Sequence, residues 1–338
     1  MSHFPADCPA IDVHTHIVPE RFPAYAGRGK DVPWPSMVPA HACHAHVMIQ
    51  GKNYRTVHQG CWHTPDRLKE MDDAGVDYAL LSENNPAAQN LAPDVAIATA
   101  KASNDFLFEA IQANPTRFGG FATLPTPAPK AAADELERCV TKLGFKGAMI
   151  MGTSNGQFLS DKEFRPIFER AVKLDVPVYL HPSPIMPAVR DAYFKDEPYF
   201  HNSGLGFGLE TLTHSFKLIT SGLFDELPAL KIIVGHLGEA APFLLWRTTE
   251  NIVRAGAKMP KALKDYYKTH FWMTTSGAFQ DSALQCAITE MGLDRILFSV
   301  DWPYIDNLQG TTWLKKTPLG EKDREAIASG NATRLLKL

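Results

Sequence analysis

The stretch at residues 118–151 reads FGGFATLPTPAPKAAADELERCVTKLGFKGAMIM, and it decides the fold class. It opens and closes with short apolar runs, Phe118–Ala122 and Gly147–Met151, and the segment Ala131–Leu143 between them is amphipathic. Apolar runs of about 4–8 residues that alternate with helical segments of about 10–15 residues indicate β-α-β units. The stretch therefore predicts two parallel strands connected by a helix.

The same alternation recurs along the chain. The other apolar runs are Ala10–Val13, Tyr78–Leu81, Val176–Leu180, Lys231–Gly235, Phe271–Thr274 and Ile296–Val300. Further amphipathic segments are Pro65–Ala74, Asp161–Leu174 and Ala283–Met291. Eight such strands predict an α/β fold, the closed (β/α)8 or TIM barrel, whose core usually takes about 250 residues. We expect residues 1–338 to form a single barrel domain, distorted by insertions.

Two segments hold the surplus residues. Pro19–Trp62 is rich in Pro, Gly and His without a helical period, so residues 19–62 are predicted to form a small lid inserted after the first strand. Pro182–Gly208 is predicted as a long loop beside the barrel mouth, and Lys322–Leu338 as a closing helix. Long loops in compact domains are usually functional. Side chains of these segments are expected to shape selectivity, namely Trp34, Met37, Trp62, Phe200 and Phe207.

Charge and composition exclude several classes of protein. The 34 Lys and Arg residues nearly balance 37 Asp and Glu residues, whereas nucleic-acid and membrane-surface binders concentrate basic residues. No apolar run approaches the roughly 20 residues of a membrane span, and the polar start resembles no signal peptide. The five cysteines are scattered, unlike a disulfide framework. We expect a cytoplasmic protein with a small-molecule partner, bound neither to nucleic acid nor to a membrane.

Five polar residues follow predicted strands. His14 and His16 end the first strand and, two residues apart, project to the same face. His181, His236 and Asp301 follow the strands at Val176–Leu180, Lys231–Gly235 and Ile296–Val300. In a (β/α)8 barrel the active site lies at the carboxyl ends of the strands. Imidazoles with a carboxylate suit a divalent metal such as Zn²⁺ or Mn²⁺, which activates water or polarises a substrate oxygen.

The strand at Gly147–Met151 ends without Lys, Glu, His or Cys, so one metal ion per chain is predicted rather than two. A rival cluster lies at His41, Cys43, His44 and His46. It suits a structural zinc ion by residue type, but no second ligand pair at finger-like spacing follows it. His44 or His46 could instead line the active site from the lid.

The chain resembles the amidohydrolase superfamily, specifically its metal-dependent nonoxidative decarboxylases. Its amino-terminal part is similar to 2-amino-3-carboxymuconate-6-semialdehyde decarboxylases in the His-x-His opening, YRTVHQGCW (54–62), RLKEMD (67–72) and GVD (75–77). Its carboxy-terminal part is similar to γ-resorcylate and 5-carboxyvanillate decarboxylases in GFGLETLTH (206–214), SGLFDELPALKIIVGHLGEAAPFLLWR (221–247), TTSGAF (274–279) and DWPY (301–304).

The resemblance implies a role for each matching residue. The metal ligands would be His14, His16, His181 and Asp301. His236 and Asp301 would be catalytic, with His236 as an acid/base or a hydrogen-bond partner. Arg55 would pair with a substrate carboxylate, and Tyr304 would line the pocket. Arg247 would reach a neighbouring subunit's site, which implies a homodimer or homotetramer.

The motifs that resemble the two types of enzyme point to different metal ions. Resorcylate-type enzymes open with Glu-x-His, but this chain has His14-Thr-His16, as in the zinc-dependent muconate-semialdehyde type. The later motifs follow manganese-dependent enzymes. The resemblance therefore implies Zn²⁺, with Mn²⁺ as the alternative.

The predicted activity is decarboxylation of a hydroxylated or amino-substituted aromatic acid, or of a related ring-fission product, in catabolism of aromatic compounds. Loss of CO2 from an sp² carbon requires prior protonation of that carbon, a Lewis acid on an adjacent oxygen and a fixed carboxylate. The same residues suit a mononuclear hydrolase, either lactonase, esterase or amidase. A non-catalytic barrel is a third possibility.

Two arginines have structural alternatives. Without the resemblance, Arg55 would be interpreted as a solvated loop arginine. Arg247 could form a helix-surface ion pair with Glu239 or Glu250.

Overall fold

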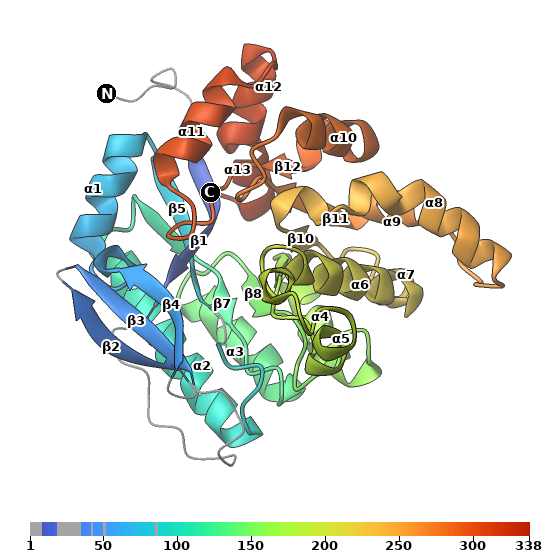
Figure 1. The fold of residues 1–338 in the computed structure, drawn as a ribbon, viewed down its shortest axis with the longest axis horizontal. Helices are drawn as coiled ribbons and strands as arrows, with labels where there is room; N and C mark the ends of the chain where they lie inside the picture. Colours follow the sequence, from blue (N-terminus) through green and yellow to red (C-terminus); the bar gives the residue numbers. More distant parts are fainter. Residues whose placement is uncertain (1–8, 19–34, 42, 50–51, 85–86) are drawn as a thin grey trace.

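The computed structural model describes residues 9–18, 35–41, 43–49, 52–84 and 87–338. Within these ranges, short parallel strands form a barrel with helices packed around it (Figure 1). The barrel strands are β1 (Ile11–Ile17), β5 (Tyr78–Glu83), β6 (Phe118–Gly120) continued by β7 (Ala122–Thr123), β8 (Ala148–Met151), β9 (Val178–His181), β10 (Ile232–Val234), β11 (Phe271–Thr274) and β12 (Ile296–Leu297). The predicted (β/α)8 architecture is confirmed.

Six helices carry Pro in their first turn, where the missing N–H is not needed: α1 (Thr64–Ala74), α2 (Pro93–Ala113), α3 (Pro129–Lys142), α4 (Arg165–Leu174), α5 (Pro187–Tyr193) and α8 (Ala241–Arg254). The other helices are α6 (Gly206–Thr220), α7 (Leu223–Glu226), α9 (Leu263–His270), α10 (Asp281–Met291), α11 (Asn307–Lys316), α12 (Glu321–Glu325) and α13 (Asn331–Leu336). Helix α1 ends at Ala74 and is capped by Gly75, whose φ of 77° suits glycine best.

The strands fall into two hydrogen-bonded groups, β1-β5-β6 and β12-β11-β10-β9-β8-β7. The chain itself connects β6 to β7, so the strand predicted at Phe118–Ala122 is broken at Phe121. At the other seam, His16 N–H donates to the Trp302 carbonyl (2.9 Å) and Asp301 N–H donates to the His14 carbonyl (2.9 Å). The seam that closes the barrel therefore passes directly through three predicted site residues.

Two apolar clusters stabilise the barrel. The larger lies between strands and surrounding helices. The smaller fills the interior of the barrel with Ile11, Val13, Leu80, Phe121, Met149, Met151, Tyr179, Ile233 and Leu297. Leu335 and Leu336 of α13 join this interior cluster, so the predicted C-terminal helix packs against the barrel core.

The insertion after β1 contains a three-stranded antiparallel sheet of β2 (Pro35–His41), β3 (His44–Ile49) and β4 (Lys52–His58) (Figure 1). Val47 and Val57 of this sheet pack with Val18 and Trp302, so the sheet lies against the loop that follows β12. Residues 19–34 of the predicted lid, Trp34 included, lie outside the described residues.

The second segment, residues 182–208, was predicted to be a loop along its whole length, but part of it is helical. It contains α5, and α6 begins at Gly206. Helix α5 has only seven residues and begins with a proline, so its sequence shows no recognisable helical period. In the described part of the chain, no helix is both long enough and apolar enough to cross a bilayer.

Candidate metal centre and active site

An irregularity in β1 places the two histidines of the His-x-His motif. Asp12 pairs with Ala79 of β5, but the next pair is Thr15 with Leu81, so β1 carries one extra residue. Such a bulge changes which side chains point inward. Ile11 and Val13 therefore face the barrel interior, and His14 and His16 face it as well.

The carboxylate of Asp12 stabilises this bulge. It accepts hydrogen bonds from the backbone N–H groups of His14 (3.0 Å) and Val300 (3.1 Å). Burial raises the pKa of Asp12 to about 7, although these two hydrogen bonds lower it. Asp12 thus connects β1 to the segment after β12, next to two predicted metal ligands.

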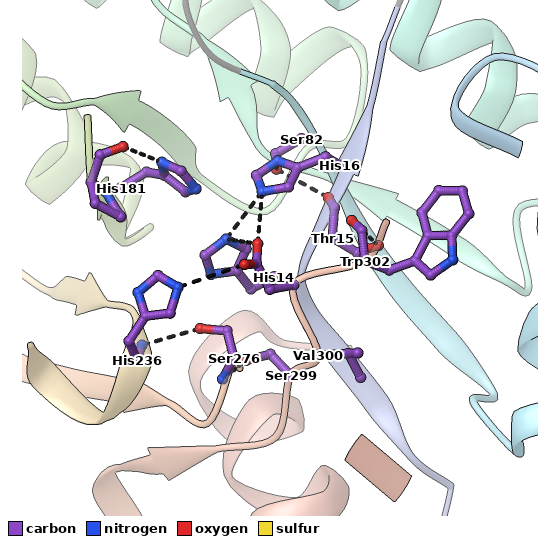
Figure 2. Close-up of polar contacts among 12 residues, drawn as sticks. His14, Thr15, His16, Ser82, His181, His236, Ser276, Ser299, Val300 and Trp302 are labelled. Atoms are coloured by element: carbon purple, nitrogen blue, oxygen red, sulfur yellow. Dashed lines mark hydrogen bonds and ion pairs between the residues drawn. The ribbon is translucent and has the colours of Figure 1, made fainter. Parts of the chain in front are cut away.

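Four predicted ligands meet at the carboxyl ends of the strands. Ligand atoms of His14, His16, His181 and Asp301 all lie within 4.8 Å of one another. Figure 2 shows the three imidazoles, together with that of His236, gathered around one point. The Oδ1 atom of Asp301 lies 3.2 Å from Nε2 of His14 and 3.3 Å from Nε2 of His16. These residues form a site for a divalent metal ion.

The hydrogen bonds of the ring nitrogens fit this assignment. Nδ1 of His14 lies 2.6 Å from the Tyr179 hydroxyl, and Nδ1 of His181 lies 2.6 Å from the Pro182 carbonyl. Nδ1 of His16 lies 3.4 Å from the Ser82 hydroxyl. Because each Nδ1 has a partner, the Nε2 lone pairs are free to face a cation. Metal-binding histidines are typically held in this way.

The electrostatics favour the protonation states that bind metal. Burial lowers the pKa of His14 to about 4 and holds the pKa of His181 well below its ordinary value. Burial raises the pKa of Asp301, but the imidazoles of His14, His16 and His236 outweigh this effect and hold it well below its usual range. Neutral imidazoles and an ionised carboxylate are the forms that ligate a metal ion.

His236 lies on an unusual turn after β10. The φ angles of His236, Leu237, Glu239 and Ala240 are 51°, 51°, 51° and 68°, and Gly238 has a φ of 82°. Left-handed conformations cost non-glycine residues about 1–2 kcal/mol each. Strain of this kind concentrates at functional sites, where the surrounding structure maintains it.

The strained turn holds His236 between two carboxylates. Its Nδ1 lies 2.5 Å from Oε1 of Glu239, and its Nε2 lies 3.8 Å from Oδ2 of Asp301. Burial alone would lower the pKa of His236, but Glu239 and Asp301 raise it to about 10. The two carboxylates thus favour the protonated form of His236, beside the metal ligands.

A cavity of about 250 Å³ opens at the metal ligands. Its lining residues are Arg55, Asn84, His181, Pro182, Ser203, Phe207, His236, Asp301, Tyr304 and Ile305. An adjoining cavity of about 310 Å³ shares Ser203, Phe207, His236, Asp301 and Ile305 with it, and adds Glu239, Gly277 and Ala278. The guanidinium carbon of Arg55 lies 4.0 Å from the centre of the Tyr304 ring. A cation on the inserted sheet and the metal ligands of the barrel therefore face the same space.

The other predicted pocket residues fall in different places. Phe207 lines the cavity, whereas Met37 and Trp62 pack in the apolar cluster around Trp302. Phe200 is half exposed and is absent from the cavity lining given by the described residues.

Arg247 is exposed on α8, away from the lining of the cavity. The alternative ion pairs for Arg247 are not formed. Glu239 contacts His236, and Glu250 lies 3.5 Å from Arg254.

The rival cluster on the inserted sheet does not converge on a metal. Within the described residues, the barrel site alone brings three or more ligand atoms together. Nδ1 of His46 lies 2.9 Å from the Thr56 hydroxyl, and Cys43 contacts His44. His44 lines a separate cavity with His58 and Glu70, so neither histidine lines the active site.

Three residues at the site were not predicted. Tyr179 lies two positions before His181 on β9, which is the spacing that places side chains on one strand face. Glu239 follows His236 by three residues, but only the left-handed turn brings them together. Asn84 directly follows β5, and its buried amide nitrogen has no hydrogen-bond partner among the described residues.

The barrel and its centre define a class, the metal-dependent enzymes that bind one or more ions at the carboxyl ends of (β/α)8 strands. The amidohydrolase family model (Amidohydro_2) matches residues 11–338, and the chain belongs to this family. The family resemblance inferred from the motifs is confirmed.

Within this family, the chain is similar to several decarboxylases. The chain is 42% identical over 284 residues to a γ-resorcylate decarboxylase of Polaromonas sp., which covers 80% of this chain and 86% of the relative. It is 29% identical over 335 residues to a 2-amino-3-carboxymuconate-6-semialdehyde decarboxylase of Dictyostelium discoideum, with 97% and 91% covered. A solved dihydroxybenzoic acid decarboxylase from Polaromonas sp. JS666, with bound manganese and the inhibitor 2-nitroresorcinol, superposes with a TM-score of 0.82 at 33% identity, with 98% and 97% covered.

Proposed function

We propose that this chain is a metal-dependent nonoxidative decarboxylase, a carboxy-lyase that releases CO2 from a hydroxylated or amino-substituted aromatic acid, or from a related ring-fission product, in catabolism of aromatic compounds. One observation carries the proposal: two metal ligands, the imidazole of His236 and the guanidinium of Arg55 all line one cavity. The resorcylate decarboxylase relatives support the choice of an aromatic hydroxy acid.

His14, His16, His181 and Asp301 would hold one divalent metal ion per chain. When bound, this ion polarises a substrate oxygen next to the carboxylate. The three imidazoles suit Zn²⁺, and the manganese in the Polaromonas structure supports Mn²⁺ as the alternative. Metal analysis of the purified protein distinguishes the two.

His236 is the residue that we assign to proton transfer. Its imidazolium, held by Glu239, donates a proton to the ring carbon that bears the carboxylate. The bond between this carbon and the carboxylate then breaks, and its electron pair restores the aromatic ring as CO2 leaves. Arg55 orients the carboxylate, Tyr304 lines the ring-binding surface, and Asp301, which would ligate the metal, faces Nε2 of His236.

The reaction is tested by measuring CO2 release from the metal-loaded enzyme with ortho-hydroxybenzoates and 2-amino-3-carboxymuconate semialdehyde. The His181→Ala variant, which lacks one ligand, is the control. We expect release by the wild type and none by the variant. Absence of CO2 across the panel, together with turnover of esters or lactones, would assign the chain to the mononuclear hydrolases instead.

Arg55→Ala is expected to weaken binding of carboxylate substrates. A hydrogen bond to a charged group contributes about 1.5–3 kcal/mol, so the KM should rise about 10–150-fold with a smaller change in kcat. Arg55→Lys should restore part of the affinity, because it keeps the charge but not the bidentate geometry. Arg170→Ala, which removes an arginine paired with Glu137 on the outer helices, is the matched control. An unchanged KM in Arg55→Ala would support the loop-arginine interpretation.

Helix α8 is the surface that we assign to a subunit interface in a homodimer or homotetramer. Phe243 and Trp246 are 81% and 71% exposed and lie beside Arg247 on the same helix. Exposed apolar groups of this size favour association, which would place Arg247 near a neighbouring site.

We expect Trp246→Glu to dissociate the oligomer in sedimentation-velocity experiments at micromolar concentration. Leu308→Glu, at an exposed leucine of α11, should leave it intact. A Trp246→Glu variant that sediments like the wild type would place the interface elsewhere.

The cytoplasmic location stays a prediction from the scattered cysteines.

A further inference from the structure

The metal ligand His14 contacts a buried chain of hydroxyl groups. Its Nδ1 lies 2.6 Å from the hydroxyl of Tyr179, which lies 2.7 Å from the Thr274 hydroxyl. The Thr274 hydroxyl lies 2.9 Å from that of Ser276, which accepts the backbone N–H of His236 at 3.1 Å. Four hydrogen bonds therefore connect a metal ligand to the turn that carries the proton donor.

The direction of these bonds follows from the ligand role of His14. Because its Nε2 faces Asp301 and the metal site, Nδ1 carries the ring proton and donates it to Tyr179. The Tyr179 hydroxyl then donates to Thr274, and Thr274 donates to Ser276. In this order each oxygen of the chain accepts one hydrogen bond from the side of His14, and the Ser276 oxygen accepts a second one from the N–H of His236.

The surrounding structure holds the chain of hydroxyls in place. Tyr179, Thr274 and Ser276 are all fully buried. The N–H of Ser276 donates to the hydroxyl of Ser299 (2.8 Å), which fixes the Ser276 end to the segment after β12 (Figure 2).

Gly235 packs directly against this chain. A Cβ atom at Gly235 would lie 3.2 Å from the Tyr179 hydroxyl, 3.4 Å from that of Ser276 and 3.5 Å from Cε1 of His14. Its φ of −77° is open to any residue, so a side chain here is disfavoured by close packing and not by backbone conformation.

We propose that Tyr179 is the positioning residue of the metal ligand His14: its hydroxyl accepts the Nδ1 proton of the metal-binding tautomer and fixes the ring plane. Through Thr274 and Ser276, the same hydroxyl couples this ligand to the turn of His236. The inference depends on the metal site and not on the identity of the substrate. A ligand held by a single, neutral hydroxyl is sensitive to the loss of that group, since partners of ligating histidines contribute strongly to metal affinity.

Tyr179→Phe removes the hydroxyl and keeps the ring. We expect the folded variant to bind Zn²⁺ about 10–100-fold more weakly than the wild type, measured by competition with a chromophoric chelator after metal removal. The visible absorption bands of the Co²⁺-loaded variant should also shift, because the His14 ring can rotate. Neither measurement requires turnover, so they stay informative if the decarboxylase proposal fails.

Tyr267→Phe is the matched control. Tyr267 is equally buried, and its hydroxyl lies 2.6 Å from that of Ser215, among the outer helices. It should lose stability without losing Zn²⁺ affinity. Thr274→Val keeps the bond between Tyr179 and His14 but removes the acceptor behind it, so an intermediate loss of affinity is expected even if Tyr179→Phe folds poorly. Wild-type Zn²⁺ affinity in Tyr179→Phe and Thr274→Val, or an equal loss in Tyr267→Phe, would overturn the proposal.

Discussion

Asp301→Asn is expected to abolish turnover while leaving the barrel folded. The side chain keeps its size, but the only carboxylate among the four ligands becomes neutral. The amide oxygen at the position of Oδ1, beside Nε2 of His14 and His16, would be a weaker ligand for a divalent cation than a carboxylate oxygen. A metal ion contributes several kcal/mol to catalysis, so kcat/KM should fall about a thousandfold or more. Metal content after dialysis and CO2 release at saturating metal are the two measurements.

The control for this variant is Asp161→Asn, at an exposed aspartate before α4. It should keep its metal, its activity and its melting temperature. Circular dichroism and thermal melting of Asp301→Asn show whether the fold survives. Substantial remaining activity in a folded Asp301→Asn variant would remove Asp301 from both the metal site and the mechanism.

Sequence alone predicted the barrel because its strands are almost entirely buried. A continuous apolar run is a local signal, and each of the eight predicted runs overlaps a strand. The break of the third strand at Phe121 and the three-stranded inserted sheet were not predicted. β2 contains Pro35 and Pro39, which weaken any strand pattern, and the sheet forms only by pairing with β3 and β4.

The ligands were predictable because strand ends in this fold converge wherever they lie in the sequence. The hydrogen bonds and the backbone geometry that hold these ligands in place were not predictable. The bulge in β1 depends on a hydrogen bond from Val300 to Asp12, 288 residues apart. The bond between Tyr179 and His14 spans 165 residues. The left-handed turn after β10 contains four non-glycine residues, so composition gives no sign of it.

Arg55 shows why residue type and strand pairing are both needed to identify a binding residue. Its residue type is common on loops, and no local pattern distinguishes a binding arginine from a solvated one. The pairing of β3 and β4 places it on the strand face that also carries Val57. Because Val57 packs against Trp302, Arg55 is brought over Tyr304 and into the cavity.

His236→Gln is expected to lower kcat without removing the metal. Glutamine retains a hydrogen-bonding group of similar reach but cannot carry the proton that Glu239 and Asp301 stabilise on the imidazole. General acid catalysis contributes about 10²–10⁴-fold, and a loss of this size is expected in kcat. Glu239→Gln should give a smaller loss, because the imidazole remains but its orientation and charge are less well held.

The separation of metal content from turnover makes this result specific. His236→Gln should bind metal like the wild type, in contrast to Asp301→Asn, since His236 is outside the four-ligand set. His63→Gln, at a histidine with a 56% exposed side chain that pairs with Asp66, is the matched control and should be fully active. A metal-loaded His236→Gln enzyme that keeps more than a tenth of wild-type kcat would mean that the proton reaches the substrate from another group, and Asp301 would then be the residue to examine.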